Sequence, residues 1–202
     1  MLRWFATVIL CLAMGYGVCL ATDFSADVSQ SMGGMKTGGK VYVSGQKMRQ
    51  EVAMAATKQI VIVRGDKGLV YMLQPAARQY MKMQGVKGEL GMNNSKAMDE
   101  LRKSATQKRL GRENVSGYSC DKSLFTFKDK KRGTLTLWSA TKLGGHPIKT
   151  EMKTSRGGVF MEYKNIKEGR QSASLFELPA GYKPMKMPAG MPGMPGVPGK
   201  RK

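Results

Sequence analysis

The stretch Ile60–Met83, IVIVRGDKGLVYMLQPAARQYMKM, decides the fold of this chain. It reads as three consecutive strands: a β-branched run ending at Arg64, an apolar strand over Leu69–Gln74, and a third strand with alternating apolar residues after Pro75. The glycines of Gly65–Gly68 suit a tight hairpin turn. Both faces of the first two strands are apolar, so we expect both faces of the sheet to be covered here by protein, lipid or a partner.

The first turn of this stretch contains Arg64-Gly65-Asp66. This tripeptide binds animal adhesion receptors when it is presented on a surface. Turns select glycine and polar residues for their backbone geometry, so we interpret the tripeptide as hairpin-turn chemistry rather than as an adhesion motif.

The first 21 residues are typical of a secretory signal peptide. Arg3 supplies the positive start, Val8–Met14 forms an apolar segment, and Cys19-Leu20-Ala21 places small residues before a cleavage after Ala21. A lipoprotein signal acylated on Cys19 and a retained membrane anchor are alternatives. We therefore expect export to the periplasm, with secretion or N-terminal membrane anchoring as the other outcomes.

Removal of the signal peptide changes the cysteine content and the charge. Cys120 is then the single cysteine, which excludes an intramolecular disulfide and a cysteine metal cluster. The chain has 34 basic residues, and one of them, Arg3, is removed with the signal peptide. The mature chain therefore has 33 basic and 14 acidic residues, a surplus of 19 positive charges. Such a charge attracts anionic partners, and an anionic membrane surface is accessible to an exported protein. The aromatic residues are too sparse to predict specific nucleic-acid binding.

Short alternating segments joined by short turns surround the opening stretch. We predict earlier strands over Phe24–Met32, Gly39–Val43 and Lys47–Met54, and later strands over 112–121, 122–128, 134–140, 148–154 and 159–165. Between the two sets lies one helix, capped by Asn94 or Ser95 and running to about Leu110, with Met98, Leu101 and Ala105 on its apolar face.

These elements predict an α+β fold. We expect a curled antiparallel sheet, a half-barrel of about eleven strands, with the one main helix covering its concave face. Residues 22–184 would form this domain, and Leu178-Pro179 would end its fold. Residues 185–202 form a Met/Pro/Gly-rich basic tail that we expect to be disordered.

An ordered set of short motifs resembles an exported bacterial family of uncharacterised domains. The motifs are Gly39-Lys40-Val41-Tyr42, Lys47-Met48-Arg49-Gln50-Glu51, Ile60–Asp66, Tyr71-Met72-Leu73-Gln74-Pro75, Gly117-Tyr118-Ser119-Cys120, Trp138, Pro147-Ile148-Lys149 and Phe176-Glu177-Leu178-Pro179-Ala180-Gly181-Tyr182. The resemblance spans about residues 24 to 184. Such domains are similar to the outer-membrane lipoprotein carriers LolA and LolB. The resemblance implies a half-barrel whose apolar concave face takes acyl chains, and an arginine that ties a lid to the sheet, for which Arg49 lies in a comparable strand.

The residues themselves also favour an apolar binding surface. Methionine is abundant, with 17 in the chain, and its flexible side chain serves adaptable surfaces. Core packing is the alternative for each residue that we expect to contact a ligand. The expected ligand-contacting residues are Val41, Val43, Met48, Val52, Ile60, Ile62, Leu69, Tyr71, Leu73, Met98, Leu101 and Trp138.

We expect a non-enzymatic periplasmic binding protein for a hydrophobic ligand, without a cofactor, whose partner is a lipid or a lipidated protein. His146 is the single histidine, and no glycine-rich phosphate loop or serine elbow appears. Two alternatives stay open. One is a copper-binding or envelope-stress protein in which Met185, Met187, Met191 and Met194 bind Cu(I), because soft thioethers suit that ion. The other is a structural envelope module with no ligand.

Overall fold

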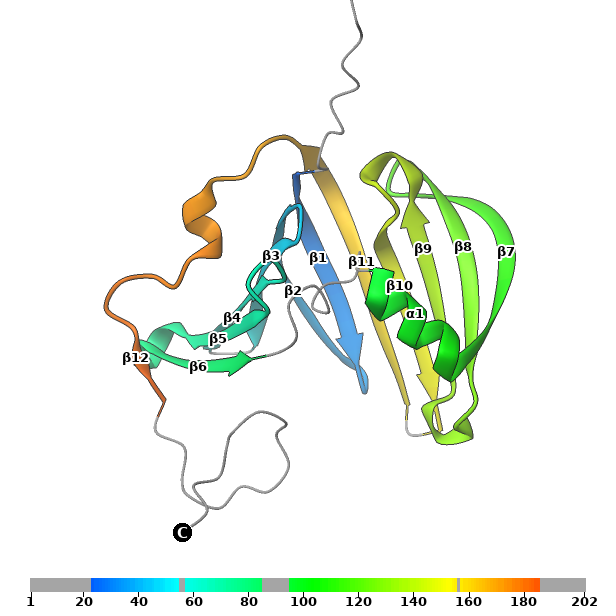
Figure 1. Ribbon diagram of the computed structural model, residues 1–202, viewed down its shortest axis with the longest axis horizontal. Helices are drawn as coiled ribbons and strands as arrows, with labels where there is room; N and C mark the ends of the chain where they lie inside the picture. The colour runs from blue at the N-terminus through cyan, green and yellow to red at the C-terminus, as the bar shows by residue number, and fades with distance from the viewer. Residues whose placement is uncertain (1–22, 55–56, 85–94, 156, 186–202) are drawn as a thin grey trace, which may run out of the picture.

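The chain forms one large curled sheet that stays open as a half-barrel (Figure 1). The computed structural model describes residues 23–54, 57–84, 95–155 and 157–185. The strand order in the sheet is β12-β6-β5-β4-β3-β2-β1-β11-β10-β9-β8-β7. Strands that are neighbours in the sheet are consecutive in sequence, except for the pairs β1–β11 and β6–β12.

The first half of the sheet is a meander of six strands. These are β1 (Phe24–Met32), β2 (Met35–Ser44), β3 (Lys47–Met54), β4 (Thr57–Arg64), β5 (Leu69–Gln74) and β6 (Gln79–Gln84), with the 3-10 turn η1 (Pro75–Ala77) between the last two. The prediction of six strands in this part of the chain is confirmed, and three of them have the predicted bounds.

The second half contains the α-helix and the remaining strands. It consists of α1 (Ser95–Ser104), β7 (Ala105–Val115), β8 (Tyr118–Phe127), η2 (Lys130–Arg132), β9 (Thr134–Ala140), η3 (Thr141–Leu143), β10 (His146–Thr154), β11 (Gly157–Glu168), η4 (Ala173–Phe176) and β12 (Lys183–Pro184). The predicted class, an open α+β half-barrel with one helix, is confirmed for the described residues.

Several predicted bounds are wrong. The strands predicted over 112–121 and 122–128 are instead β7 (Ala105–Val115) and β8 (Tyr118–Phe127). The helix ends at Ser104 rather than near Leu110, because residues 105–115 pair with β8 along its length and become β7. The fold does not end at Leu178-Pro179 either. The chain returns to the sheet, where Lys183 and Pro184 pair in parallel with Gln79 and Tyr80. The sheet is therefore mixed rather than wholly antiparallel, and it has twelve strands rather than about eleven.

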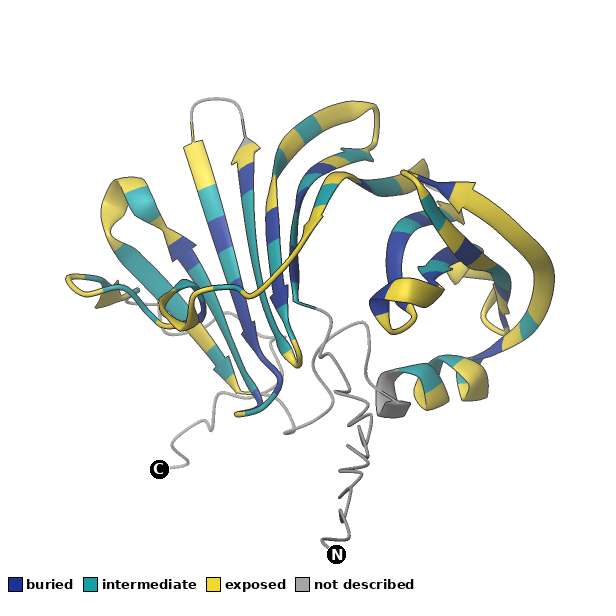
Figure 2. Cartoon of the chain, turned by 90° about the horizontal axis from the view of Figure 1, so that it is seen from above, coloured by how far each residue is buried: buried dark blue, intermediate teal, exposed yellow. Residues whose placement is uncertain are grey.

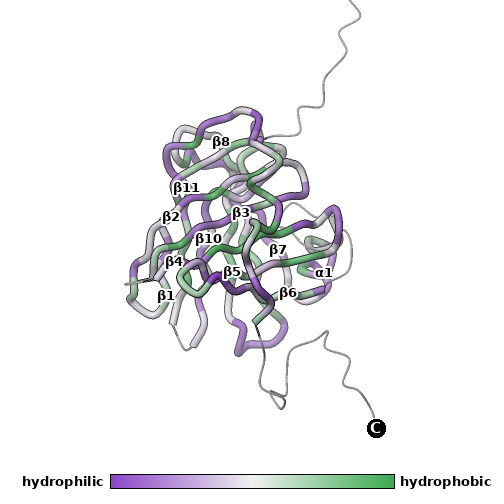
Figure 3. Tube along the Cα trace, turned by 90° about the vertical axis from the view of Figure 1, so that its left-hand side faces the viewer, coloured by the Kyte–Doolittle hydropathy of each residue, from purple (hydrophilic) through white to green (hydrophobic). Residues whose placement is uncertain are grey.

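Hydrophobic and hydrophilic residues are interleaved along the strands, as the tube colours of Figure 3 show. Burial concentrates in the central strands, whereas the edge strand β7 is exposed over most of its length (Figure 2). The fully buried side chains are chiefly β-branched, leucine or aromatic, as expected for a sheet interior.

The buried residues form three clusters. The largest gathers Phe24, Val41, Trp138, Tyr163 and their neighbours where β1 meets β2 and the second half of the sheet. A second cluster, of Ile60, Ile62 and Leu73, lies under Phe176 of η4. A third joins Phe125, Phe127 and Leu137 to Met98 and Leu101 of α1.

Candidate functional site

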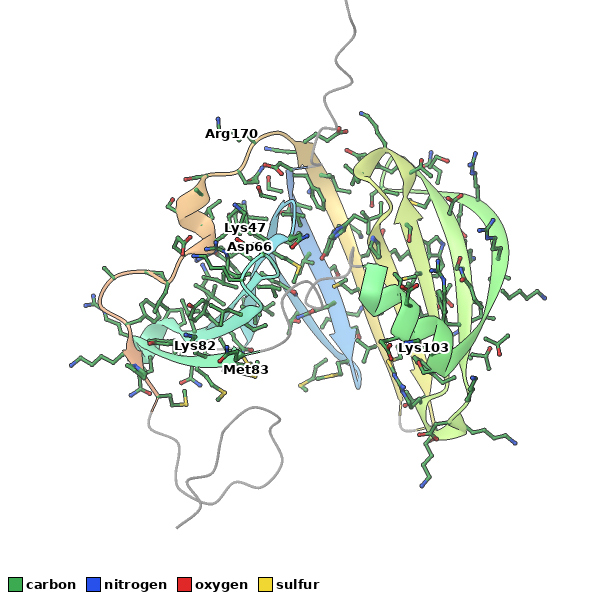
Figure 4. All side chains as sticks on the ribbon, in the orientation of Figure 1. Lys47, Asp66, Lys82, Met83, Lys103 and Arg170 are labelled. Carbon is green, nitrogen blue, oxygen red and sulfur yellow. The ribbon has the colours of Figure 1, made fainter. Side chains whose placement is uncertain are left out.

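Seven methionine and valine side chains share one face of β3–β6, opposite to the face that contacts η4. The strand register forms two adjacent rows: Met48, Val63, Val70 and Met83, and next to it Gln50, Val61, Met72 and Met81. We call the seven apolar members the Met–Val face: Met48, Val61, Val63, Val70, Met72, Met81 and Met83. Among them Val63 is buried and the others are half-buried, so the face remains partly open. Figure 4 labels Met83 at the β6 side.

The opposite face of the same strands is closed by the chain itself. Ile60, Ile62 and Leu73 lie beneath Phe176, and Leu175, Leu178 and Tyr182 complete the cover. Tyr71, which was also expected to contact a ligand, packs at the margin of this cluster, and Leu69 follows half-buried on the same strand. Both faces of the opening stretch are thus apolar, as predicted. The structure shows that the cover on this face is protein.

The Met–Val face continues toward the centre of the sheet. Met48 pairs with Val43, and Val41 and Val43 are buried in the largest cluster with Trp138. Val52 is buried beside Gly39, its partner on β2. These are five of the residues that the sequence predicted to contact a ligand, and of them Met48 belongs to the Met–Val face.

One hydrogen bond between polar side chains lies within this apolar surface. The side-chain amide of Gln50 donates a hydrogen bond of 3.3 Å to the side-chain oxygen of Gln30, which reaches from β1 across β2. The intervening strand carries Gly38 and Gly39 at this level, so no side chain from β2 blocks the contact. The amide groups of the two glutamines are thereby partly satisfied within a face that is otherwise apolar.

The second predicted part of the site lies at α1. Met98 and Leu101 pack on Phe125 and Leu137, and a cavity of about 430 Å³ opens beside them, between α1 and strands β7–β9. Met98 lines this cavity together with Phe125 and Leu137. The helix residues that the sequence singled out are therefore brought to one apolar cluster, about half a sheet away from the Met–Val face.

The rim of the α1 cavity is basic. Arg112 donates to Asp121 at 3.0 Å, and Lys122 bonds to Glu113 at 2.8 Å. Arg109 has no acidic partner among the described residues. The hydrogen bond from Lys122 holds the pKa of Glu113 below its ordinary value. An apolar wall with a cationic rim suits an amphiphile with an anionic end.

Trp138, which was expected to contact a ligand, lies between two lysines. The ammonium groups of Lys122 and Lys149 are 4.9 Å and 4.6 Å from its ring centroid. The ring itself is buried in the largest cluster. The two lysines make cation–π contacts with the ring, and the expected ligand contact of Trp138 stays a prediction.

Arg49 ties the C-terminal segment to the sheet. Its guanidinium bonds to Glu51 at 2.7 Å and donates to the backbone oxygen of Leu175 in η4 at 3.2 Å. Burial opposes ionisation of Glu51, but hydrogen bonds from Lys58 and Arg49 keep its pKa below the ordinary value. The anchored element is thus the η4 segment, and the expected tie between Arg49 and the helix stays a prediction.

Arg64 makes a second tie at the hairpin of the opening stretch. It is 6% exposed, and two of its nitrogens bond to the two carboxylate oxygens of Asp66 at 2.8 and 2.7 Å. It also contacts the carboxylate of Glu177. Hydrogen bonds from Arg64 lower the pKa of Asp66. Because the arginine is buried and paired, Arg64-Gly65-Asp66 is a structural turn, as interpreted from the sequence.

The remaining sequence candidates are Cys120 and the methionines of the C-terminal segment. Among the described residues, no three His, Cys, Asp or Glu side chains lie close enough to hold a metal ion. Cys120 is buried, and burial raises its pKa. Met185 is half-buried, and its backbone N–H donates to Tyr80. Met187, Met191 and Met194 lie outside the described residues.

The sequence analysis missed most of the Met–Val face. It named Met48, but not Val61, Val63, Val70, Met72, Met81 or Met83 as ligand contacts. The alternation that identifies them was visible, since Val61 and Val63 oppose Ile60 and Ile62 on β4. The deciding information was which face the C-terminal segment covers, and this contact spans more than a hundred residues of sequence.

No helix within the described ranges has the length and apolar character needed to cross a membrane. A protein-family model described as "Domain of unknown function (DUF4412)" matches residues 26–145, which is more than half of the chain. This match confirms the expected family of uncharacterised domains. No protein of curated function matches the sequence.

Several solved structures are similar. An uncharacterised conserved protein from Thermus thermophilus has a TM-score of 0.59 at 11% identity, covering 82% of this chain and 91% of that chain. The Pseudomonas aeruginosa MucA/MucB complex gives a TM-score of 0.54 at 14% identity, covering 77% of this chain and 55% of that one. The present chain thus spans about half the length of the MucB chain.

A LolA superfamily protein from Nitrosomonas europaea also aligns. The identity is 12%, the TM-score is 0.37, and the alignment covers 78% of this chain and 91% of that chain. The shared fold itself is shown by the Thermus and MucB structures, which have the higher TM-scores.

Proposed function

The chain belongs to the DUF4412 family, and from this premise and the geometry of its sheet we propose a non-enzymatic envelope protein that binds a hydrophobic ligand. The ligand class is an acyl chain, carried by a lipid or a lipidated protein. The observation that carries the proposal is the Met–Val face, where six half-buried apolar side chains lie side by side on four adjacent strands.

The chemistry of this face supports an acyl ligand. Methionine side chains are unbranched and polarizable, and they repack easily around a flexible chain. Isolated exposed apolar residues are common on proteins, but a continuous patch marks a binding surface. The α1 cavity, where Met98, Phe125 and Leu137 lie beside basic residues, is a separate apolar contact for such a ligand.

Export forms part of the same proposal. Its support is the sequence of residues 1–21, with cleavage after Ala21, and the described fold begins just beyond that point, at Asp23. N-terminal sequencing of the protein recovered from its own host checks this part. A mature chain that still starts at Met1 contradicts it.

Binding of the fluorescent fatty acid cis-parinaric acid tests the proposal. We expect Met72→Asn and Met81→Asn, on adjacent strands of the Met–Val face, to weaken binding by about tenfold or more, because burial of a methionine contributes about 1.5–3 kcal/mol. Leu110→Asn is the matched control, since Leu110 is 42% exposed on β7. Thermal unfolding of each variant shows that the fold is kept. Equal affinity in all three variants contradicts the proposal.

A peptide is the second candidate occupant. MucB, which shares the fold, was solved as a complex with MucA. A protein ligand for the present chain would compete with cis-parinaric acid if it used the Met–Val face. Competition by a lipidated peptide, but not by the same peptide without lipid, distinguishes acyl binding from recognition of the peptide itself.

A further inference from the structure

Two hairpin turns and two strand ends meet at one end of the sheet. Met32 pairs with Met35 across the β1–β2 turn and with Val159 at the start of β11. Lys153, near the end of β10, pairs with Thr134, which begins β9 after the β8–β9 turn. We call this end the hairpin rim: the β1–β2 and β8–β9 turns with the strand residues that flank them, the last residues of β10 and the first residues of β11. In Figure 1 the β1–β2 and β8–β9 turns point in the same direction.

The hairpin rim carries an exposed apolar patch. Met35, Met32 and Val159 are 70%, 61% and 39% exposed, and the register makes them direct neighbours on three adjacent strands. A hollow of about 560 Å³ lies among them. Of the four large apolar side chains that are exposed within the described ranges, these three lie together and Leu110 lies apart. Exposure that is gathered at one spot indicates a contact surface.

Basic residues are frequent in the segments of the hairpin rim. They are Lys36 on β2, Lys128, Lys130, Lys131 and Arg132 at the β8–β9 turn, and Lys153 on β10. Asp129 and Glu151 are the acidic residues of the same segments, so six basic groups stand against two acidic ones. Asp129 accepts a hydrogen bond from the backbone of Lys131, which fixes the basic turn η2. Lys153 bonds to Glu151 at 3.1 Å, and Arg132 stacks on Phe127 at 3.9 Å.

We propose that the hairpin rim docks on the surface of an anionic lipid bilayer. Exposed methionine and valine enter the boundary between headgroups and acyl chains, while lysines around them contact lipid phosphates. An acidic protein would pair with the basic residues but would not bury the exposed side chains of Met32, Met35 and Val159. This docking is independent of the proposed ligand binding, because none of its residues belongs to the Met–Val face.

Vesicle co-sedimentation tests the docking. The chain without residues 1–21 is used, because that apolar segment binds lipid by itself and its removal leaves every described residue in place. The vesicles contain phosphatidylcholine and phosphatidylglycerol in equal parts, with pure phosphatidylcholine as the neutral comparison. We expect strong binding to the anionic vesicles that weakens as salt is added.

Two pairs of variants separate the apolar and the charged contributions. Met32→Ser with Met35→Ser should weaken binding about tenfold, from lost apolar burial. Lys130→Gln with Lys131→Gln should weaken it about 25-fold, since each basic residue near an anionic bilayer contributes about fivefold. The controls are Leu110→Ser and the doubly substituted Lys164→Gln with Lys167→Gln, which change exposed residues elsewhere.

Equal binding of the rim variants and their controls overturns the proposal, and so does a wild-type chain that stays in solution with anionic vesicles. Sedimentation equilibrium adds a further check. The wild-type chain could instead form a dimer and fail to bind vesicles. If Met32→Ser with Met35→Ser then dissociates that dimer, the patch is an interface between copies, and the proposal is overturned. The fatty-acid affinity of the rim variants stays at the wild-type value if the two sites are independent.

Discussion

His146 is a buried base whose two ring nitrogens have no hydrogen-bond partner within the described part of the chain. Its ring stacks on Tyr163 at 5.9 Å and meets the edge of Phe24 at 5.1 Å. Burial lowers its pKa from 6.5 to about 4. The folded protein therefore holds the neutral imidazole, and protonation favours unfolding.

This burial predicts a pH-dependent stability. The contribution of His146 to the free energy of unfolding should be fully present above pH 6.5 and should fall as the pH drops from 6.5 to about 4. The total loss from this group is about 3 kcal/mol, and it does not increase further below about pH 4. His146→Phe keeps an aromatic ring and removes the two unsatisfied nitrogens, so its stability should decline less than that of the wild type in this window, with only the carboxylates of lowered pKa contributing. Urea unfolding at pH 7 and pH 4.5 measures both proteins. An equal decline in the two contradicts this account of His146.

Arg64 shows how one buried charge joins distant segments. Asp66 on its own hairpin and Glu177 near the C-terminus both bond to it. Asp66→Asn removes the charged partner of two hydrogen bonds to a guanidinium that is 6% exposed, and should cost about 2 kcal/mol. Glu177→Gln should cost about 0.5 kcal/mol, because the Glu177 side chain is 58% exposed. Chemical unfolding of the two variants gives the order, and a larger loss for Glu177→Gln would contradict it.

At the scale of elements, adjacent glycines on β2 have different requirements. A Cβ on Gly39 would lie 1.8 Å from the backbone oxygen of Glu51 on β3, whereas a Cβ on Gly38 meets its nearest atom at 3.7 Å. Gly39→Ala must therefore force β2 and β3 apart.

We predict that Gly39→Ala destabilises the protein by about 3 kcal/mol, the upper range for overpacking. Gly38→Ala is the matched control, and its effect should stay within about 0.5 kcal/mol. The difference between their urea midpoints measures this. Similar midpoints for the two variants would mean that β2 and β3 do not approach closely at Gly39.

The elements that the sequence predicted well are those with local signals. Strands β1, β3 and β9 have alternating residues, β5 is a short apolar run between two turns, and the bounds of all four agree with the structure. For residues 105–110 the prediction was wrong, because they were assigned to the helix and form part of a strand. Lysine, arginine and leucine suit a helix, and the strand conformation of β7 comes from pairing with β8, which no local pattern reveals.

Strand β7 also shows how the edge of this sheet is kept from pairing. Its register with β8 shifts between Arg109 and Arg112, and Gly111 within the shift has a φ of +93°. Lys108, Arg109 and Arg112 are exposed along the strand. A bulge and charged side chains are common protections of an edge strand against aggregation.

At the scale of the whole molecule, the sequence predicted the half-barrel but not its closing contacts. The pairing of β1 with β11 and the return of β12 to β6 join segments more than a hundred residues apart. The same long-range return decides which face of β4 and β5 is covered. Because both faces are apolar, local patterns could not show that Ile60, Ile62 and Leu73 lie under Phe176 while Val61 and Met72 stay partly open.

Hydrophobic-ligand binding is the central claim at this scale. Two features of the intact molecule support it: the partly open Met–Val face, and the α1 cavity with its basic rim. A protein of this kind should retain its natural ligand through a gentle purification, because a buried acyl chain gains about 0.8 kcal/mol for each methylene group.

Native mass spectrometry of the chain, purified without detergent from the envelope of its own host, tests this claim most directly. We predict an added mass of lipid or acyl size that organic solvent releases, and a reduced fraction of that bound form in Met72→Asn but not in Leu110→Asn. A spectrum with only the unliganded protein, unchanged after incubation with membranes, would contradict the claim.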